Sequence, residues 1–235
     1  MFEMRQLCCR GELYERGRLA CLCYNHGMTL TLSSIADNPG LATYPFALAS
    51  GEQEVLRPLL LDDINKLGNF LLGLSDETKR LVTSADSHLP TAVELCEAIN
   101  KYDKLRFVVE TVPEPEADKR IVGLMEFSFD IPEGDIERYR SAGYDLDQKT
   151  DCRFGPTIAD DYQNKGLGSE LFPYVKKIAQ QFGKKRIILW GGVLKDNERA
   201  IHYYEKHGFK TVGEFSDDDS EMVDMILDLD DFETV

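Results

Sequence analysis

The sequence contains no run of about 18 apolar residues, which is the length that a helix needs to cross a bilayer. Residues 1–18 carry charged side chains throughout and lack the apolar core of a secretory signal peptide. We therefore expect no membrane partner and, as the default, a cytoplasmic location.

Cysteine pairs with the spacing of a zinc site are also missing. The six cysteines stand at positions 8, 9, 21, 23, 96 and 152, and His26 lies near the first four. A structural zinc site usually places two to four residues between paired ligands, so that both thiolates reach one ion. Cys8 and Cys9 are adjacent, and adjacent cysteines do this poorly. We expect reduced thiols and no metal.

Basic residues are absent from Thr211 to Val235, where ten acidic residues give a charge of −10. The net charge of −15 argues against binding to nucleic acid. Residues 163–210, by contrast, hold ten basic and four acidic residues. We expect an anionic ligand at this locally basic segment, although a solvated helix face would show the same pattern.

Hydrophobic residues make up 43% and charged residues 29% of the chain, as in an ordinary globular protein. For 235 residues one folded domain is expected, and we assign it to residues 51–235. Residues 1–50 form an N-terminal extension of unclear structure, in which Thr29–Leu32 alternates as a short strand does. Met28 is a second candidate for the natural start.

The order of the expected elements predicts an α/β (α+β) fold. Strands are expected at residues 53–60, 105–112, 120–129, 153–159, 186–194, 209–215 and 222–229. Helices are expected at residues 64–71, from 75, at 91–101, at 167–182 and from 197, with an inserted loop at 131–150. This order gives a mixed, mostly antiparallel sheet with helices on both faces and one parallel pair joined by a crossover helix.

A glycine-bearing turn, Asp160–Gly168, joins an expected strand to the helix at 167–182. The N-terminus of a helix has unpaired N–H groups and the positive pole of the helix dipole, so it suits a phosphate. Gly166 and Gly168 let a ligand approach the backbone, and Lys165 adds a positive charge. Glycines also end strands for purely structural reasons, so the turn by itself is a weak signal.

A second motif follows some thirty residues later. The chain reads Gln-x-x-Gly-x-Gly at 163–168 and then Asn-x-x-Ala-x-x-x-Tyr-x-x-x-Gly-Phe at 197–209. In order and spacing this pair resembles the GCN5-related N-acetyltransferase (GNAT) superfamily, clearly over residues 153–215 and more loosely back to residue 53. The resemblance implies the sheet described above. It also implies transfer of acetyl from acetyl-coenzyme A directly to a primary amine of a small molecule or peptide, in a ternary complex.

The resemblance assigns residues to the co-substrate. It implies that backbone N–H groups of the turn bind the pyrophosphate, from Gln163, Asn164, Lys165, Gly166, Leu167, Gly168 and Ser169. Ile158 and Ala159 match positions that contact the pantetheine arm and thioester, where an N–H group would polarise the carbonyl. Asn197 matches a contact to the arm, and a helix cap alone would explain it equally well.

Two further residues are assigned to proton transfer. The resemblance implies that Tyr204 is the general acid that protonates the leaving thiolate, although a core aromatic residue is the plain alternative and Tyr203 stands next to it. Attack by an amine also needs a base. Glu126, or else Glu110, is a candidate on its expected strand, but an ordinary carboxylate on a strand face explains each as well.

Two other interpretations remain open. A binding module of the same fold would hold an acyl-coenzyme A as a sensor, without catalysis. The acidic excess would suit a cationic acceptor such as a polyamine, or a basic partner for the C-terminal tail. The sequence leaves both a monomer and a homodimer open.

Overall fold

The computed structural model describes residues 29–82, 91–97, 104–113, 119–217 and 220–229. Its strands are β1 Tyr44–Ala47, β2 Gln53–Pro58, β3 Lys104–Thr111, β4 Ile121–Ser128, β5 Asp151–Ile158, β6 Arg186–Leu189, β7 Val193–Leu194, β8 Lys210–Asp217 and β9 Ser220–Asp228. Its α-helices are α1 Leu32–Asp37, α2 Ile64–Gly73, α3 Asp76–Val82, α4 Ala92–Glu97, α5 Glu133–Ser141, α6 Leu167–Gln181 and α7 Glu198–Lys206. Short 3-10 helices are η1 Pro39–Ala42, η2 Leu61–Asp63 and η5 Asp160–Tyr162.

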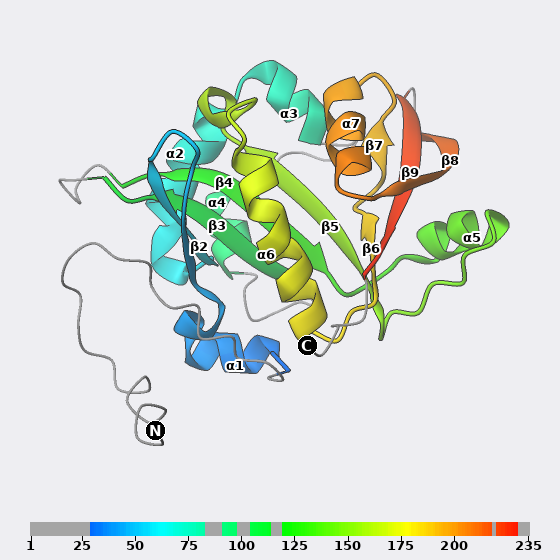
Figure 1. Ribbon diagram of the computed structural model, residues 1–235, viewed down its shortest axis with the longest axis horizontal. Helices are drawn as coiled ribbons and strands as arrows, with labels where there is room; N and C mark the ends of the chain where they lie inside the picture. Colours follow the sequence, from blue (N-terminus) through cyan, green and yellow to red (C-terminus); the bar gives the residue numbers. More distant parts are fainter. Residues whose placement is uncertain (1–28, 83–90, 98–103, 114–118, 218–219, 230–235) are drawn as a thin grey trace, which may run out of the picture.

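The strands form one sheet in the order β1-β2-β3-β4-β5-β6-β9-β7, with β8 paired to β9. Neighbouring strands run antiparallel except for β5 and β6, which are parallel and are connected through α6. Figure 1 shows α6 in front of the sheet, beside β5 on the side away from β6. The mixed, mostly antiparallel sheet and its single parallel crossover, both predicted from the sequence, are confirmed.

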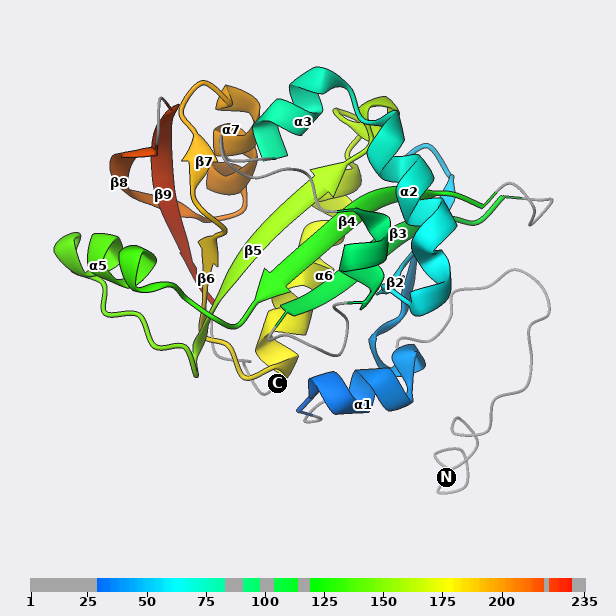
Figure 2. The same cartoon turned by 180° about the vertical axis from the view of Figure 1, so that it is seen from behind.

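Helices cover both faces of this sheet. α6 lies over one face with α1 and α7, whereas α2 and α4 cover the opposite face (Figures 1 and 2). Three phenylalanines from adjacent strands, Phe107, Phe127 and Phe154, pack ring against ring in the core that α6 closes. This core fixes where α6 begins, and with it the position of the glycine-bearing turn.

The apolar residues whose periodicity predicts α6 are also the residues that this helix buries. Leu167, Leu171, Val175 and Ile178 recur at steps of three and four, and all four side chains are buried. Such a stripe makes a helix pack along one side against a sheet. The prediction of a helix over 167–182 is therefore confirmed.

The expected strand at Thr29–Leu32 is wrong, because α1 begins there. Thr31 is the N-cap of α1, and its hydroxyl accepts from the N–H of Ser34 while the Ser34 hydroxyl accepts from the N–H of Thr31. This reciprocal capping box favours a helix over a four-residue alternation. Residues 29–48 then pack on the main core, and β1 pairs with β2, so a division at residue 50 cuts through the sheet.

The single strand expected at 186–194 is interrupted. β6 ends at Leu189 and β7 begins at Val193, and between them Gly191 and Gly192 adopt φ of 71° and 75°. A Cβ on Gly192 would lie 3.0 Å from both the Phe215 ring and the Val223 carbonyl oxygen. The conformation and the close approach both require glycine, so the backbone turns away here instead of continuing along β5.

The inserted segment at 131–150, expected as a loop, contains the nine-residue helix α5. The Tyr139 hydroxyl donates to the Met225 carbonyl at 2.8 Å, and Arg138 forms an ion pair with Asp224 at 2.8 Å. These contacts hold α5 against β9, so the segment is part of the packed fold.

Some of the predictions concern residues outside the described ranges. They are the four N-terminal cysteines with His26 and the start at Met28. Within the described ranges, no helix combines the length and apolarity needed to cross a membrane.

Glu54 on β2 gives a prediction for stability against pH. Its side chain is 1% exposed, and burial, reinforced by the charge of Glu52, raises its pKa from 4.5 to about 7. A carboxyl whose folded-state pKa is raised stabilises the fold fully below its unfolded pKa, and this contribution is lost as the pH rises through about 7. Replacement by glutamine is expected to raise the free energy of unfolding at pH 8 by about 1 to 3 kcal/mol and to change it little at pH 4.

Urea unfolding of wild type and Glu54→Gln at pH 4, 6 and 8 measures this effect. The exposed Glu137→Gln serves as the control and should show no such pH-dependent difference. An equal effect of Glu54→Gln at all three pH values would contradict the argument.

Candidate active site

The turn between η5 and α6 exposes a series of backbone N–H groups. Asn164 has φ of 59° and Gly166 has φ of 87°, a local geometry that turns successive N–H groups toward one side. Ser169 and Glu170 both donate to the Gly166 carbonyl and so close the first turn of α6. Among the described residues, no backbone hydrogen bond from the N–H groups of 164–168 is found. They are therefore placed to bind an anion at the N-terminus of α6.

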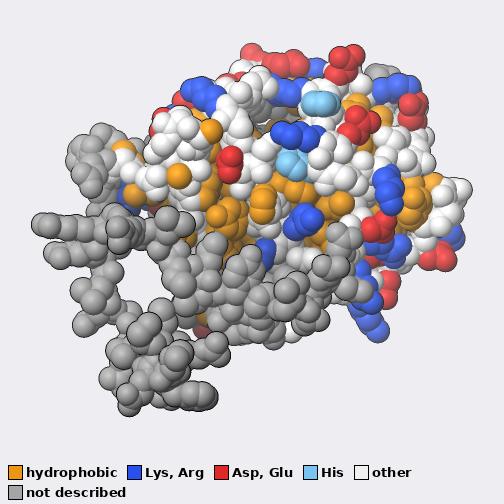
Figure 3. Space-filling model, viewed as in Figure 1, with side chains coloured by type: hydrophobic (Ala, Val, Ile, Leu, Met, Phe, Trp, Pro, Cys, Tyr) orange, Lys and Arg blue, Asp and Glu red, His pale blue; other side chains and the backbone are white. Residues whose placement is uncertain are grey.

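Positive charge near the turn comes from two lysines. Lys165 is part of the turn, and Lys206 on α7 lies 3.1 Å from the Ser169 hydroxyl through its Nζ. Among the described residues visible on the face that carries α6 and α7, basic side chains are interspersed with acidic and apolar ones and form no continuous patch (Figure 3). The favourable charge is thus local to the turn. Sequence reasoning missed Lys206, because its position depends on the packing of α7 against α6.

Gly168 is needed at the contact between α6 and α7. A Cβ at this position would lie 3.0 Å from the Tyr203 ring, and the Tyr203 hydroxyl donates to the Gly168 carbonyl at 3.1 Å. Any side chain would push α7 away from the start of α6. The second glycine of the motif is therefore explained by helix packing as well as by access to a ligand.

The edge of β5 is open beyond Phe154. The parallel ladder with β6 ends at the pair Phe154–Leu189, and the two strands diverge from there (Figure 1). The Ala159 N–H donates to Val122 on β4 at 2.9 Å, so by the alternation of an antiparallel ladder the Ile158 N–H points away from β4 and into the gap. Of the two sequence-predicted backbone donors, Ile158 is the one that faces the gap.

The two tyrosines of α7 occupy different environments. Tyr204 is 7% exposed and packs edge-on against Phe209, and burial raises the pKa of its hydroxyl. The hydroxyl of Tyr203 is engaged with Gly168, as described above. Tyr204 thus satisfies the requirement that an acid be protonated at neutral pH, but its ring is also part of the core. Asn197 caps α7, because its Oδ1 accepts from the Ala200 N–H at 3.2 Å.

The two candidate bases lie at different places on the sheet. Glu126 stands opposite Gly155 on β5, and a Cβ on Gly155 would lie 3.6 Å from that of Trp190. Glu126 is therefore brought near the divergence of β5 and β6, where it is 25% exposed and accepts from Arg106 Nε at 2.7 Å. Glu110 lies near the other end of β3 and is paired with Arg57 and Lys66. Burial alone would raise the pKa of Glu110, but these two cations hold it below its ordinary value, which makes it a poor base.

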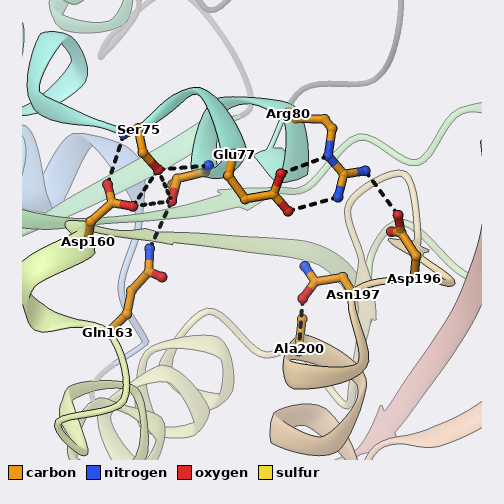
Figure 4. A network of polar contacts seen from close by, with 9 residues as sticks. Ser75, Glu77, Arg80, Asp160, Gln163, Asp196, Asn197 and Ala200 are labelled. Atoms are coloured by element: carbon orange, nitrogen blue, oxygen red, sulfur yellow. Dashed lines mark hydrogen bonds and ion pairs between the residues drawn. The ribbon is translucent and has the colours of Figure 1, made fainter.

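A polar network that the sequence did not predict joins the turn to α3. Asp160 and Gln163 form hydrogen bonds with Ser75 and Thr78, which are 82 to 85 residues away in the chain (Figure 4). No local pattern could have shown these contacts. Within the described part of the chain, no group of three or more His, Cys, Asp or Glu side chains is arranged to hold a metal ion.

Solved structures share this fold. The GNAT domain of a Streptomyces lividans protein designated PAT superposes with a TM-score of 0.61 at 18% identity, covering 81% of this chain and 99% of that one. A GNAT-family acetyltransferase from Streptococcus pneumoniae gives 0.56 at 22% identity, covering 75% and 99%. Spermidine N-acetyltransferase from Vibrio cholerae, solved with CoA and spermine, gives 0.53 at 20% identity, covering 75% and 95%.

The sequence itself also matches a family model. The model described as the acetyltransferase (GNAT) family aligns with residues 85–209, which is 125 of the 235 residues. This range holds the strands β3 to β7, the turn, α6 and α7, and hence every residue assigned from the sequence to cofactor binding or proton transfer. The chain belongs to the GNAT family of acyl-CoA-dependent N-acetyltransferases.

Proposed function

We propose that this protein transfers acetyl from acetyl-coenzyme A directly to a primary amine of a small molecule or peptide, within a ternary complex. One observation carries the proposal. The N–H groups of 164–168 at the start of α6 lie directly after β5, whose open edge faces the gap toward β6. An open strand edge followed by an anion-binding turn suits a long ligand that carries a thioester at the end of an arm and a pyrophosphate further along it.

Each residue has a role in this proposal. The backbone N–H groups of residues 164–168 bind the pyrophosphate, whereas those of Gln163 and Ser169 donate to the carbonyls of Asp160 and Gly166. Lys165 and Lys206 add positive charge. The Ile158 N–H binds the thioester carbonyl oxygen, where negative charge develops in the transition state. When bound, acetyl-coenzyme A supplies the activated acetyl group. Asn197 orients the start of α7 and contacts the arm.

Proton movement is assigned to two side chains. Glu126 accepts the proton of the incoming amine, directly or through water, since only a neutral amine is nucleophilic. Tyr204 donates a proton to the departing sulfur. Arg106 holds Glu126 in place through the contact of its Nε with the carboxylate.

The acceptor that two observations favour is a cationic amine such as a polyamine. In support, the spermidine N-acetyltransferase of similar fold was solved with CoA and spermine, a polyamine. The net charge of −15 favours the approach of a cationic amine at low ionic strength.

A second candidate function is a non-catalytic sensor that binds an acyl-coenzyme A. The burial of Tyr204 at 7% exposure is the observation that favours it, because a purely structural tyrosine would look the same. The two candidates make the same prediction for binding and opposite predictions for turnover.

The test combines calorimetry with a thiol-release assay. The proposal predicts that acetyl-coenzyme A binds, and that coenzyme A is released in proportion to added amine, after subtraction of hydrolysis without amine. Initial rates at varied concentrations of both substrates should give intersecting lines, since a covalent acetyl-enzyme would give parallel ones. Binding without release by any amine of a panel of polyamines, amino acids and lysine peptides would favour the sensor. Absence of binding would overturn both.

A further inference from the structure

The turn assigned to the pyrophosphate is attached to α3 by one carboxylate. Asp160 Oδ2 accepts from the Ser75 N–H at 2.9 Å, and Oδ1 accepts from the hydroxyls of Ser75 and Thr78, the latter at 2.8 Å. Ser75 in turn caps α3, because its hydroxyl accepts from the Thr78 N–H at 3.2 Å. Asp160 therefore binds the first turn of α3 from outside the helix (Figure 4).

Gln163 makes a second connection to the same place. Its Nε2 donates to the Thr78 hydroxyl at 3.1 Å and to the Ile158 carbonyl at 2.9 Å. The Thr78 hydroxyl thus joins Asp160 and Gln163, the residues at the start and just after the end of η5. Together these bonds fix the path of the chain from the end of β5 into the turn.

The other end of α3 reaches α7. Arg80 Nη1 lies 3.1 Å from Asp196, which directly precedes the α7 cap Asn197, and Arg80 also pairs with Glu77. α3 therefore lies between the turn and the start of α7, as the two ribbon views and the close-up show (Figures 1, 2 and 4). The Arg80 pair is exposed and contributes little energy. Asp160 is exposed too, but it accepts three hydrogen bonds from the N-terminus of α3, where Arg80 makes a single ion pair with Asp196.

The negative charge of Asp160 next to a turn that binds an anion is explained by its bonds to α3. A carboxylate beside a bound pyrophosphate repels it. Hydrogen bonds from Ser75, and then from Thr78, hold the pKa of Asp160 below its ordinary value, so it is charged at neutral pH. Its charge is directed at the N-terminus of α3, where an anion is favourable.

We propose that Asp160 is a positioning residue, which holds the turn at 163–168 in its anion-binding conformation by anchoring it to Ser75 and Thr78 of the α3 N-terminus. The proposal rests on the proposed function, because it assumes that this turn binds the pyrophosphate. Asp160 itself contacts neither the pyrophosphate nor the reacting atoms. Its contribution is to keep the backbone N–H groups converged before the ligand arrives, which lowers the ordering cost of binding.

The test compares two acetyl donors. Acetyl-coenzyme A contains the pyrophosphate, whereas S-acetylpantetheine keeps the thioester and arm but lacks it. In Asp160→Ala, kcat/KM for acetyl-coenzyme A is expected to fall about tenfold through KM, with kcat at saturation unchanged. With S-acetylpantetheine, kcat/KM is expected to stay within about twofold of wild type.

The neighbouring residue provides a matched control. Asp161→Ala removes the same charge, but Asp161 is 54% exposed and pairs with Arg120 instead of α3. It is expected to leave both donors unaffected. A fall of equal size with both donors in Asp160→Ala, or no fall with acetyl-coenzyme A, would overturn the proposal.

A conservative variant guards against misfolding of Asp160→Ala. Thr78→Val keeps the shape of the buried side chain but removes the hydroxyl shared by Asp160 and Gln163, and it should show the same donor-specific loss at about threefold. The double variant should lose no more than Asp160→Ala alone, because both act through one network. Additive losses in the double variant would contradict the conclusion that Asp160 and Thr78 act through one network. If wild type itself binds no coenzyme A in calorimetry, the proposed function fails; if wild type binds it and the variants bind it equally, only the positioning role fails.

Discussion

Replacement of Tyr204 by phenylalanine is expected to lower kcat about 100-fold, while KM for acetyl-coenzyme A changes by less than about twofold. Positioned acid catalysis typically contributes a factor of about 10² to 10⁴. The phenylalanine ring fills the same space against Phe209, so the core is kept and the effect reports the hydroxyl alone. Steady-state kinetics with a saturating amine measures it, and thermal unfolding confirms that the variant is folded.

Tyr203→Phe is the matched control one residue away. It removes a hydroxyl that donates to the Gly168 carbonyl, so we expect a higher KM for acetyl-coenzyme A with kcat nearly unchanged. If Tyr203→Phe lowers kcat and Tyr204→Phe does not, the acid is Tyr203. If neither variant changes kcat, the proton comes from elsewhere and the tyrosine of the motif serves packing.

Replacement of Asp151 by alanine is expected to lower the free energy of unfolding by about 3 to 5 kcal/mol. Asp151 begins β5 with a fully buried side chain and accepts from Arg186 Nε at 2.9 Å and Nη2 at 2.7 Å, across the parallel β5–β6 pair. It also accepts from the Asp147 N–H at 2.7 Å. Removing the carboxylate leaves a partly buried guanidinium and a backbone N–H without this partner.

An exposed pair on the same part of the sheet provides the comparison. Lys210 and Asp228 lie 3.1 Å apart on β8 and β9 with more than half of each side chain exposed. Asp228→Ala should cost less than about 1 kcal/mol, because exposed ion pairs contribute little. Urea unfolding at pH 7 measures both variants. Equal losses would show that burial of Asp151 is not what makes its ion pair important.

Sequence reasoning succeeded where the information is local. The β5-α6-β6 unit was predictable because its patterns are contained in short segments of sequence. The apolar stripe of α6 spans a few helical turns, and the apolar run of β6 spans a few residues. It failed at Thr29–Leu32, where four alternating residues are too few to outweigh a capping box. It also missed the interruption at Gly191–Gly192, since the sequence shows two glycines but not the Phe215 ring that lies against them.

The candidate site divides in the same way. The turn and the α7 motif are contiguous in sequence, so their residues could be assigned. The partners of Asp160 lie on α3, more than 80 residues earlier, and no spacing rule connects them. Likewise, the choice between Ile158 and Ala159 depends on the register of β5 with β4, which a single sequence does not determine.

The open edge of β5 has a consequence for how fast a ligand can bind. Phe154 accepts from the Trp190 N–H across the last bond of the parallel pair, so Pro156 and Ile158 face the same way, into the gap. Proline has no N–H to donate to a partner strand. Gly191 and Gly192, which follow Trp190, bend the backbone after β6 away from β5. The two strands therefore cannot pair across the gap when no ligand is bound. Ligand binding needs no prior separation of strands, and we expect single-exponential association kinetics whose rate rises linearly with ligand concentration.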